Sequence, residues 1–305
     1  MHKYRQFEIK PNLELRARII QAVRRFFIQR GYLEVETPCR IPAPAPEANI
    51  DLEISGDWFL QASPEICMKM LLAADYRRIF QICKCFRRAE RGKRHLPELT
   101  MLEWYSTAQN YMDIMKDCEQ LIQFVLKDLG IEEPIVYQGV EIKLKPPWQR
   151  MTVAQAFARY ASMPMNEAVS RDRFDEIMVE ELEPQFGSNP LFLYDYPASR
   201  GSLARLKPDA PYLAERFELY IGGLELCNAF SELTDPVEQR RRFEKEQTIK
   251  KLSGKPVSSL PEKFLHALAD IPQAAGNAMG IDRLVMLFAD EANIDEVVAF
   301  RPEEL

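Results

Sequence analysis

Charged side chains gather between two apolar segments in the stretch from Ile79 to Tyr105. Its two ends are rich in β-branched, aromatic and apolar residues, which predicts two antiparallel strands joined by a loop. The loop contains one glycine and five basic residues: Gly92, Arg87, Arg88, Arg91, Lys93 and Arg94. An arginine at the base of this hairpin, facing Glu98 and Glu103 on the opposite strand, can hold an anionic group while the acids hold a cation. The alternative interpretation is a charged surface hairpin without chemistry.

A second set of acids lies on the two segments that flank Gly222-Gly223, which predict a β-hairpin after a buried strand over 191–197. The acids are Glu215, Glu218, Glu225 and Glu232, and the last three recur every seven residues. Odd spacing alternates faces along one strand, so a shared face requires the turn and a bulge or strand end before Glu232. Carboxylates inside an apolar sheet are costly without a cation. A magnesium ion that carries nucleotide phosphates would explain one pair of these acids, and an ammonium group of a ligand would explain another acid. The alternative is that the acids lie solvated at the edge of the sheet.

Two helix starts carry further candidates. A short strand from Trp58 precedes a helix for which Ser63 is the expected N-cap and Glu65 lies in the first turn. By itself this is ordinary helix-start chemistry. Small residues from Ala275 onward lead into an amphipathic helix with Arg283 one turn inside. That pattern suits close approach of the backbone to a nucleotide and a guanidinium over its phosphate or base, although a structural helix flanked by glycines is the alternative.

The remaining elements are predicted to position these residues. A helix capped by Asn12 runs to Gly31 and leads into a strand that Pro38 ends. The proline-rich residues 40–49 predict a loop near the mouth of the site. The other expected elements are a helix over 111–129, a short β excursion over 134–147, a helical scaffold without chemistry over 151–186, and a polar loop over 198–211 with Arg200, Arg205 and Lys207.

Composition narrows the class of protein. The chain has 305 residues, of which 47% are hydrophobic and 28% charged, enough for one large core or two modest ones. No apolar run approaches the roughly 20 residues of a membrane span, and the start has no signal-peptide core, so we expect a cytoplasmic protein. The six cysteines and three histidines show no zinc-ligand spacing, and Cys83 and Cys85 are expected to be buried free thiols. A net charge of −6 argues against a broad nucleic-acid-binding surface.

Three motifs in order resemble the class II aminoacyl-tRNA synthetases. Residues 79–105 contain the F-R-x-x-E and H-x-P-E-x-T-x-L-E-x-Y patterns of motif 2, most closely that of the lysine enzymes. The helix and strand over about 14–38 resemble motif 1, with Pro38 at its proline, and residues 276–290 resemble motif 3 with G-x-x-x-G-x-D-R. The resemblance implies a single α+β catalytic domain over residues 1–305, with a mixed, mainly antiparallel β-sheet flanked by helices, and a homodimer formed through motif 1.

The resemblance also implies roles for individual residues. For ATP it implies Arg87, Glu90, His95, Glu218, Glu225, Gly280 and Arg283, with Arg87 and Arg283 catalytic and Glu218 and Glu225 holding Mg²⁺. For the amino-acid substrate it implies Ser63, Glu65, Glu103, Tyr105, Asn228, Glu232 and Ala278, with Tyr105 and Glu232 at the distal ammonium. The chain departs from the family at Ala229, where relatives have glycine, and at Glu90, which lies one place later than the usual acid.

Too few residues precede the motif 1 helix to form the anticodon-reading barrel that lysyl-tRNA synthetases carry there. The chain therefore resembles the lysyl-tRNA synthetase paralogues that activate (R)-β-lysine with ATP and transfer it to a lysine of elongation factor P. Alanine at position 278, where the synthetases have glycine, points the same way and would leave lysine a poorer substrate. Neither tRNA nor a membrane is an expected partner. The alternatives are a tRNA-charging enzyme with a borrowed anticodon-binding partner, an adenylate-forming ligase with another acceptor, and a non-catalytic amino-acid sensor.

Overall fold

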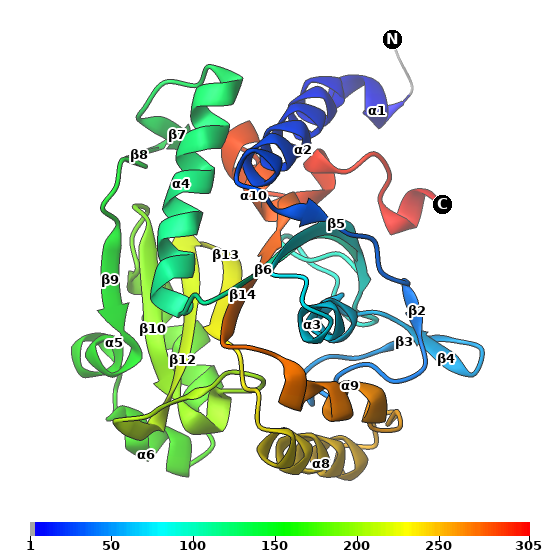
Figure 1. Cartoon of the computed structure of the whole chain (residues 1–305). Coiled ribbons are helices and arrows are strands. Elements are labelled where there is room, and N and C mark those ends of the chain that lie inside the picture. Colours follow the sequence, from blue (N-terminus) through cyan, green and yellow to red (C-terminus); the bar gives the residue numbers. More distant parts are fainter. Residues whose placement is uncertain (1–3) are drawn as a thin grey trace.

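The fold is built on one nine-stranded sheet, seen in a computed structural model that describes residues 4–305 (Figure 1). The strand order is β1-β5-β6-β14-β13-β12-β10-β9, with the short β11 paired to β12. The bounds are β1 Leu33–Glu34, β5 Arg78–Phe86, β6 Glu98–Thr107, β9 Gln149–Thr152, β10 Leu191–Pro197, β11 Leu206–Lys207, β12 Ala210–Ile221, β13 Leu224–Ser231 and β14 Ala274–Gly280. Only the outermost pairs, β1 with β5 and β9 with β10, are parallel. The expected mixed, mainly antiparallel sheet is confirmed.

Helices cover both faces of the sheet. On one face α2 (Lys10–Gln29), α4 (Tyr111–Leu129) and α10 (Ile281–Ala289) pack together over the central strands (Figure 1). On the other face lie α3 (Glu65–Ala73), α8 (Pro236–Leu252) and α9 (Glu262–Ala267). Neighbouring residues on one strand point into different cores, since Trp104 packs under α2 whereas Tyr105 packs with α3. The alternation of a strand therefore lets β6 present a site residue on one face while anchoring the sheet on the other.

The smaller elements lie at the margins of this sheet. Helices α5, α6 and α7 pack against β10 and build a second core. Their bounds are Val153–Tyr160, Met165–Ser170 and Phe174–Ile177. The others are α1 Arg5–Glu8, β2 Arg40–Ile41, β3 Glu53–Ser55, β4 Trp58–Leu60, β7 Ile135–Tyr137 and β8 Val140–Ile142. None of the helices in residues 4–305 is long and apolar enough to cross a membrane.

Two predicted helix starts are shifted, one by three residues and the other by one. Helix α2 begins at Lys10, so Asn12 is not its cap. The Asn12 amide instead donates to Glu291 and to the carbonyl of Glu296, because tertiary partners compete with the local cap. Ser63 accepts from the backbone N–H of Glu65 at 3.0 Å as expected of a cap, although α3 begins one residue later than predicted. The predicted strand over 32–38 is reduced to Leu33–Glu34.

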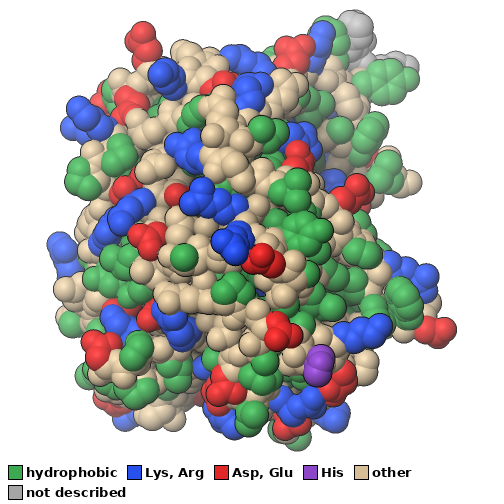
Figure 2. All heavy atoms as spheres, viewed as in Figure 1, with side chains coloured by type: hydrophobic (Ala, Val, Ile, Leu, Met, Phe, Trp, Pro, Cys, Tyr) green, Lys and Arg blue, Asp and Glu red, His purple; other side chains and the backbone are tan. Residues whose placement is uncertain are grey.

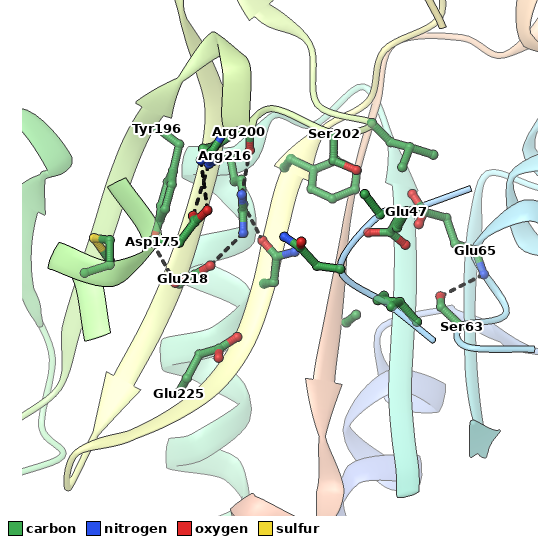
Figure 3. A pocket seen from close by; sticks show the side chains of 18 of the residues that line it. Glu47, Ser63, Glu65, Asp175, Tyr196, Arg200, Ser202, Arg216, Glu218 and Glu225 are labelled. Carbon is green, nitrogen blue, oxygen red and sulfur yellow. Dashed lines mark hydrogen bonds and ion pairs between the residues drawn. The ribbon is translucent and has the colours of Figure 1, made fainter. Parts of the chain in front are cut away.

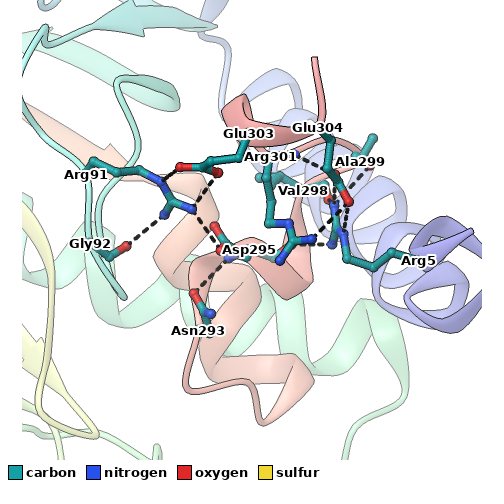
Figure 4. Close-up of polar contacts among 10 residues, drawn as sticks. All are labelled: Arg5, Arg91, Gly92, Asn293, Asp295, Val298, Ala299, Arg301, Glu303 and Glu304. Carbon is teal, nitrogen blue, oxygen red and sulfur yellow. Dashed lines mark hydrogen bonds and ion pairs between the residues drawn. The ribbon is translucent and has the colours of Figure 1, made fainter.

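Arginines tie the C-terminal segment to the basic loop between β5 and β6 and to α1 (Figure 4). Arg91 binds Asp295 at 2.9 Å and Glu303 at 2.8 Å, and Arg5 of α1 binds Glu304 at 2.9 Å.

The expected free thiols are present: all six cysteines are unpaired, with Cys85 buried and Cys83 half-buried. Glu98 does not face an arginine as predicted, because it pairs with the exposed Lys84 on the neighbouring strand.

A buried ion pair joins α2 to α10 and the sheet. Asp282 lies 2.7 Å from Arg16 and accepts the backbone N–H of Thr100 at 2.7 Å. Replacing Asp282 by alanine leaves Arg16 without its carboxylate partner, so we expect the free energy of unfolding to fall by about 3–5 kcal/mol in denaturant titration. Glu14→Ala, which breaks the exposed pair with Lys10, is the control and should change it by less than about 1 kcal/mol. Equal effects would contradict this role for Asp282.

Candidate active site

A cavity of about 600 Å³ lies over the sheet where β6, β14, β13 and β12 run side by side (Figure 3). Nine of the fourteen predicted site residues line it: Ser63, Glu65, Arg87, Glu103, Tyr105, Glu218, Glu225, Asn228 and Ala278. The other five, Glu90, His95, Glu232, Gly280 and Arg283, are not among the residues that line it. The structure thus gathers residues from the whole length of the chain into one pocket.

The strand register arranges the lining residues in two rows. Glu103, Ala278, Asn228 and Glu218 are directly paired across four adjacent strands. The next row, in the same order, is Tyr105, Gly276, Phe230 and Arg216. Directly paired residues of antiparallel strands share a face, so each row crosses the floor of the cavity. A bulge between the pairs of Leu219 and Tyr220 brings Glu225 to this face, which explains how acids at odd spacing meet.

One end of the cavity is strongly acidic. Glu103 accepts hydrogen bonds from Ser63 at 2.6 Å and from Tyr105 at 2.5 Å. Burial, together with the neighbouring Glu65, raises the pKa of Glu103 to about 8. Burial likewise raises the pKa of Glu232 to about 8, even though a lysine lies against it. Carboxyl groups whose ionisation is this unfavourable are suited to receive a cationic ligand, which would restore their charged form.

Lys69 of α3 is a residue that the sequence analysis missed. It is almost completely buried, lies 2.5 Å from Glu65 and forms an ion pair with Glu232. Burial lowers its pKa, but the carboxylates of Glu232 and Glu65 outweigh burial and raise the pKa to about 12. The available signal was a lysine four residues after Glu65 within an otherwise apolar helix.

Glu232 does not line the cavity, because Lys69 pairs with it and the ring of Tyr105 lies beside it. A Cβ atom on Gly276 would come within 2.2 Å of the Tyr105 ring and 3.0 Å of Glu232. Glycine is therefore required at this position for Tyr105 to pack onto β14. The role of Glu232 at a substrate ammonium remains a prediction. Glu232 would act on the side of the cavity floor where the ring of Tyr105 lies.

Away from these acids the cavity lining carries arginines as well as further acids, and Arg87 is one of these arginines. The buried Nε of Arg87 has no hydrogen-bond partner among residues 4–305, and its guanidinium lies 3.6 Å from Glu90. Arg87 thus has a donor left for an anion such as a phosphate. Its expected counterpart Glu103 is occupied elsewhere, with Ser63 and Tyr105.

Arg216 was also missed by the sequence analysis, although its two-residue spacing from Glu218 placed both on one face of a strand. It binds Glu218 at 2.6 Å and donates from Nε to the side-chain oxygen of Asn228 at 2.9 Å (Figure 3). The amide NH₂ of Asn228 is then left to donate to a ligand carboxylate. Tyr196 and Tyr220 also donate to Glu218, whose pKa burial raises.

Arg283 lies beside Glu225, which lines the cavity. It donates to the carbonyl of Glu225 at 2.7 Å and lies 2.6 Å from the ring of His95. Burial, with Arg283 next in importance, lowers the pKa of His95 and favours the neutral ring. Glu218 and Glu225 supply hard oxygen ligands that fit Mg²⁺. Within residues 4–305 no group of three metal-binding side chains occurs, so nucleotide phosphates and water would complete the coordination.

The region 151–186 was predicted to be a scaffold without chemistry, and this is wrong. Six of its residues line the cavity: Asp172, Phe174, Asp175, Met178, Val179 and Glu183. At the rim Arg200 binds Asp175 at 2.8 Å and Asp172 at 3.3 Å, and so joins this region to the loop after β10. Periodicity could predict the helices, but it could not indicate which side of the sheet they would cover.

Comparison with known proteins agrees with this site. The model of the family of class II tRNA synthetases (D, K and N) matches residues 1–304. A lysine–tRNA ligase of Magnetococcus marinus is 35% identical over 96% of this chain. Two proteins named elongation factor P–(R)-beta-lysine ligase, from Klebsiella pneumoniae and Histophilus somni, are 36% and 38% identical over 95% of it.

The chain therefore belongs to the class II tRNA synthetase family, and it is an ATP-dependent ligase of that type. It spans 64% of the length of the Magnetococcus lysine–tRNA ligase, but 94% of each of the two elongation factor P–(R)-beta-lysine ligases. Of these three relatives, the two of matching length are the elongation factor P–(R)-beta-lysine ligases.

The charge balance around Lys69 predicts a pH-dependent loss of stability in Lys69→Met. At pH 8 the variant leaves Glu65 and Glu232 without their cation, so we expect the free energy of unfolding to fall by about 3–5 kcal/mol. At pH 6 the raised pKa of Glu232 keeps that carboxyl protonated, so the loss should be smaller. The control is Lys84→Met, which breaks an exposed pair. A loss independent of pH would show that packing, and not charge, explains the effect.

The raised pKa of Glu103 predicts that the ligand-free protein loses stability as pH rises. Between its ordinary value and about 8 the folded state binds a proton that the unfolded state has released, so the free energy of unfolding falls over this range. We expect a loss on the order of 1–3 kcal/mol between pH 5 and pH 8. Glu103→Gln should flatten this dependence in thermal unfolding, whereas the exposed Glu98→Gln should leave it unchanged. Identical pH profiles of wild type and Glu103→Gln would refute the assignment.

Proposed function

We propose that this protein activates (R)-β-lysine with ATP as an acyl-adenylate and transfers it to a lysine side chain of elongation factor P. The observation that carries the proposal is the group of buried acids at one end of the cavity, with arginines elsewhere in its lining. Glu65, Glu103 and Glu232 gather around the buried Lys69, so a ligand with two amino groups would balance them. Relatives that the chain covers almost completely carry the corresponding name.

In the first step the substrate carboxylate attacks the α-phosphorus of ATP and pyrophosphate leaves. Asn228 orients the attacking carboxylate with its amide NH₂, because Arg216 already occupies its oxygen. Arg87 neutralises the charge that develops on the α-phosphate through its unpartnered Nε, and Arg283 does so at the edge of the cavity. Bound Mg²⁺, held by Glu218 and Glu225, would neutralise the phosphates. Positioning and electrostatics suffice for this step, without a protein nucleophile.

Ala278 supports β-lysine as the preferred substrate. Its pairing with Glu103 on one side and Asn228 on the other puts its methyl group between the amine-binding and carboxylate-binding residues. A methyl group at this point opposes an amino group on the α-carbon and tolerates one on the β-carbon. Discrimination by one methyl group is worth about 1–3 kcal/mol, which leaves lysine as a poorer substrate.

The charge distribution supports a protein acceptor over tRNA. Figure 2 shows basic and acidic side chains interspersed over one face of the molecule, unlike the extended basic surface that tRNA binding usually requires. In the loop between β5 and β6, Arg91 is occupied by Asp295 and Glu303, and Arg94 donates to the carbonyl of Gly223. Charge reversal at these arginines would disturb the fold, so Lys93 is the better position for testing contact with an acceptor.

Two exposed hydrophobic residues bear on the assembly of the protein. We infer one catalytic domain that dimerises through the motif 1 elements, because Ile28 at the end of α2 and Leu33 of β1 are large, exposed hydrophobic residues at one edge of the sheet. Sedimentation of the purified protein measures this directly.

Arg283→Ala is expected to reduce amino-acid-dependent pyrophosphate exchange by at least about 100-fold, because it removes a stabilising charge at the reacting phosphates. The protein should remain folded, and Arg159→Ala on the exposed side of α5 should retain wild-type exchange. Exchange by Arg283→Ala within a few-fold of wild type would contradict its role.

The acceptor is tested with ATP, Mg²⁺ and radiolabelled (R)-β-lysine. We expect label on one lysine of elongation factor P and essentially none on total tRNA, whereas efficient labelling of tRNA would favour a lysine–tRNA ligase activity instead. Vigorous exchange with no labelling of either would point to another acceptor. Absence of exchange with lysine and both β-lysine enantiomers would favour an amino-acid sensor.

A further inference from the structure

A second, smaller cavity opens from the side of the active site. Its volume is about 190 Å³, and its walls come from α8 and from the loop after β10. Four residues line both cavities: Glu47, Ser199, Ser202 and Glu246. The two spaces therefore meet at these residues. The side cavity is smaller than the roughly 300 Å³ of ordinary ligand pockets, so it suits one side chain and not a second small molecule.

Glu47 stands at the junction with its carboxylate unoccupied. Within residues 4–305 this carboxylate takes part in no hydrogen bond or ion pair, although it lies near Glu65 at the acidic end (Figure 3). The backbone beside it is fixed, because the N–H of Ala48 donates to Glu246 at 2.8 Å. A half-buried acceptor without a donor, held by a fixed loop at the meeting point of two cavities, is suited to receive a proton from an incoming group.

The charges that face Glu47 come from every surrounding element. They are Glu65 of α3, Arg87 after β5, Arg216 of β12, and Glu246 and Lys250 of α8. Burial first, and then Glu65, raises the pKa of Glu47 to about 7, against the opposite effect of the two arginines. Glu65 belongs to the amine-binding end and Arg87 to the phosphate-binding end, so Glu47 lies near the region where the acyl carbonyl of an adenylate must sit.

We propose that the side cavity admits the acceptor amine, a lysine side chain, and that Glu47 is the general base that deprotonates it. This inference rests on the proposed function for the existence of the adenylate. Glu47 and Glu246 attract the ammonium to the inner end, whereas the rest of the wall carries Lys245 and Glu238, the latter paired with Arg241 and Arg242. The amino-acid substrate and ATP would occupy the main cavity, and the acceptor would approach from α8.

The transfer step conserves atoms and charge. The Glu47 carboxylate takes one proton from the acceptor ammonium. The freed lone pair forms a C–N bond with the acyl carbonyl carbon, and the bond from that carbon to the phosphate oxygen breaks, with its electron pair leaving on AMP. The second proton on nitrogen passes to water in the cavity, and an amide is formed.

Glu47→Gln tests this assignment because it removes the base but keeps the shape of the side chain. Pyrophosphate exchange should remain within about threefold of wild type, while single-turnover transfer from preformed adenylate to elongation factor P, or to Nα-acetyl-lysine amide, should fall by about 100-fold or more. The wild-type transfer rate should rise through an inflection near pH 7, and the variant should lose that inflection. Hydroxylamine, which is already unprotonated at neutral pH, should react equally well with both. Glu244→Gln, on the exposed side of α8, is the matched control.

Ser199→Trp tests the route by filling the junction of the two cavities. It should slow transfer to the lysine acceptors more than it slows exchange, whereas Ser253→Trp at the far end of α8 should change neither.

Loss of exchange in Glu47→Gln would overturn the inference, because Glu47 would then bind the first substrate. Unchanged transfer, or no transfer by wild type to either acceptor despite exchange, would also overturn it. Loss of exchange in the wild type would instead refute the proposed function.

Discussion

The balance of charge around Lys69 is the constraint on which the acidic end of the site depends. Buried carboxylates are tolerated only when a cation and hydrogen bonds compensate them. Glu65 and Glu232 share Lys69, while Glu103 relies on the hydroxyl groups of Ser63 and Tyr105. This arrangement stabilises the empty site only partly, as the raised pKa values of Glu103 and Glu232 indicate. The remaining imbalance is what a ligand with ammonium groups would relieve, so the same interaction limits stability and favours binding.

The antiparallel sheet converts distant sequence positions into a continuous binding surface. Each row of the floor takes one residue from each of four strands. In the first row the side chain therefore changes from strand to strand, from Glu103 at one end to Glu218 at the other. The small residues of β14 lie in the middle of both rows. Gly276 leaves room for the Tyr105 ring, and Ala278 adds one methyl group between the polar residues. A change at either position alters the shape of the site without altering its charge.

Several features of the site could be predicted from local patterns. The hairpin over residues 79–105 was indicated by apolar alternation at both ends, and the hairpin around Gly222-Gly223 by its glycine turn. The need for a bulge also followed from spacing, because acids at odd intervals can share a face only where the alternation is interrupted. Cap positions were less predictable. Asn12 has the chemistry of a cap, but tertiary partners took its hydrogen bonds instead.

The sequence by itself determined the types of the reacting groups and the elements that carry them, because alternation, turns and motif order are local properties of the chain. Only the tertiary structure decided which charges neutralise one another. Lys69 and Glu232 are far apart in the chain and yet form a buried pair, Arg87 keeps a free donor, and Arg91 is committed to the C-terminal segment. The sequence also could not predict that residues 151–186 form a wall of the cavity, or that two cavities meet at Glu47. The physical reason is that burial and Coulombic interaction depend on distances in space, which the spacing along a chain does not fix.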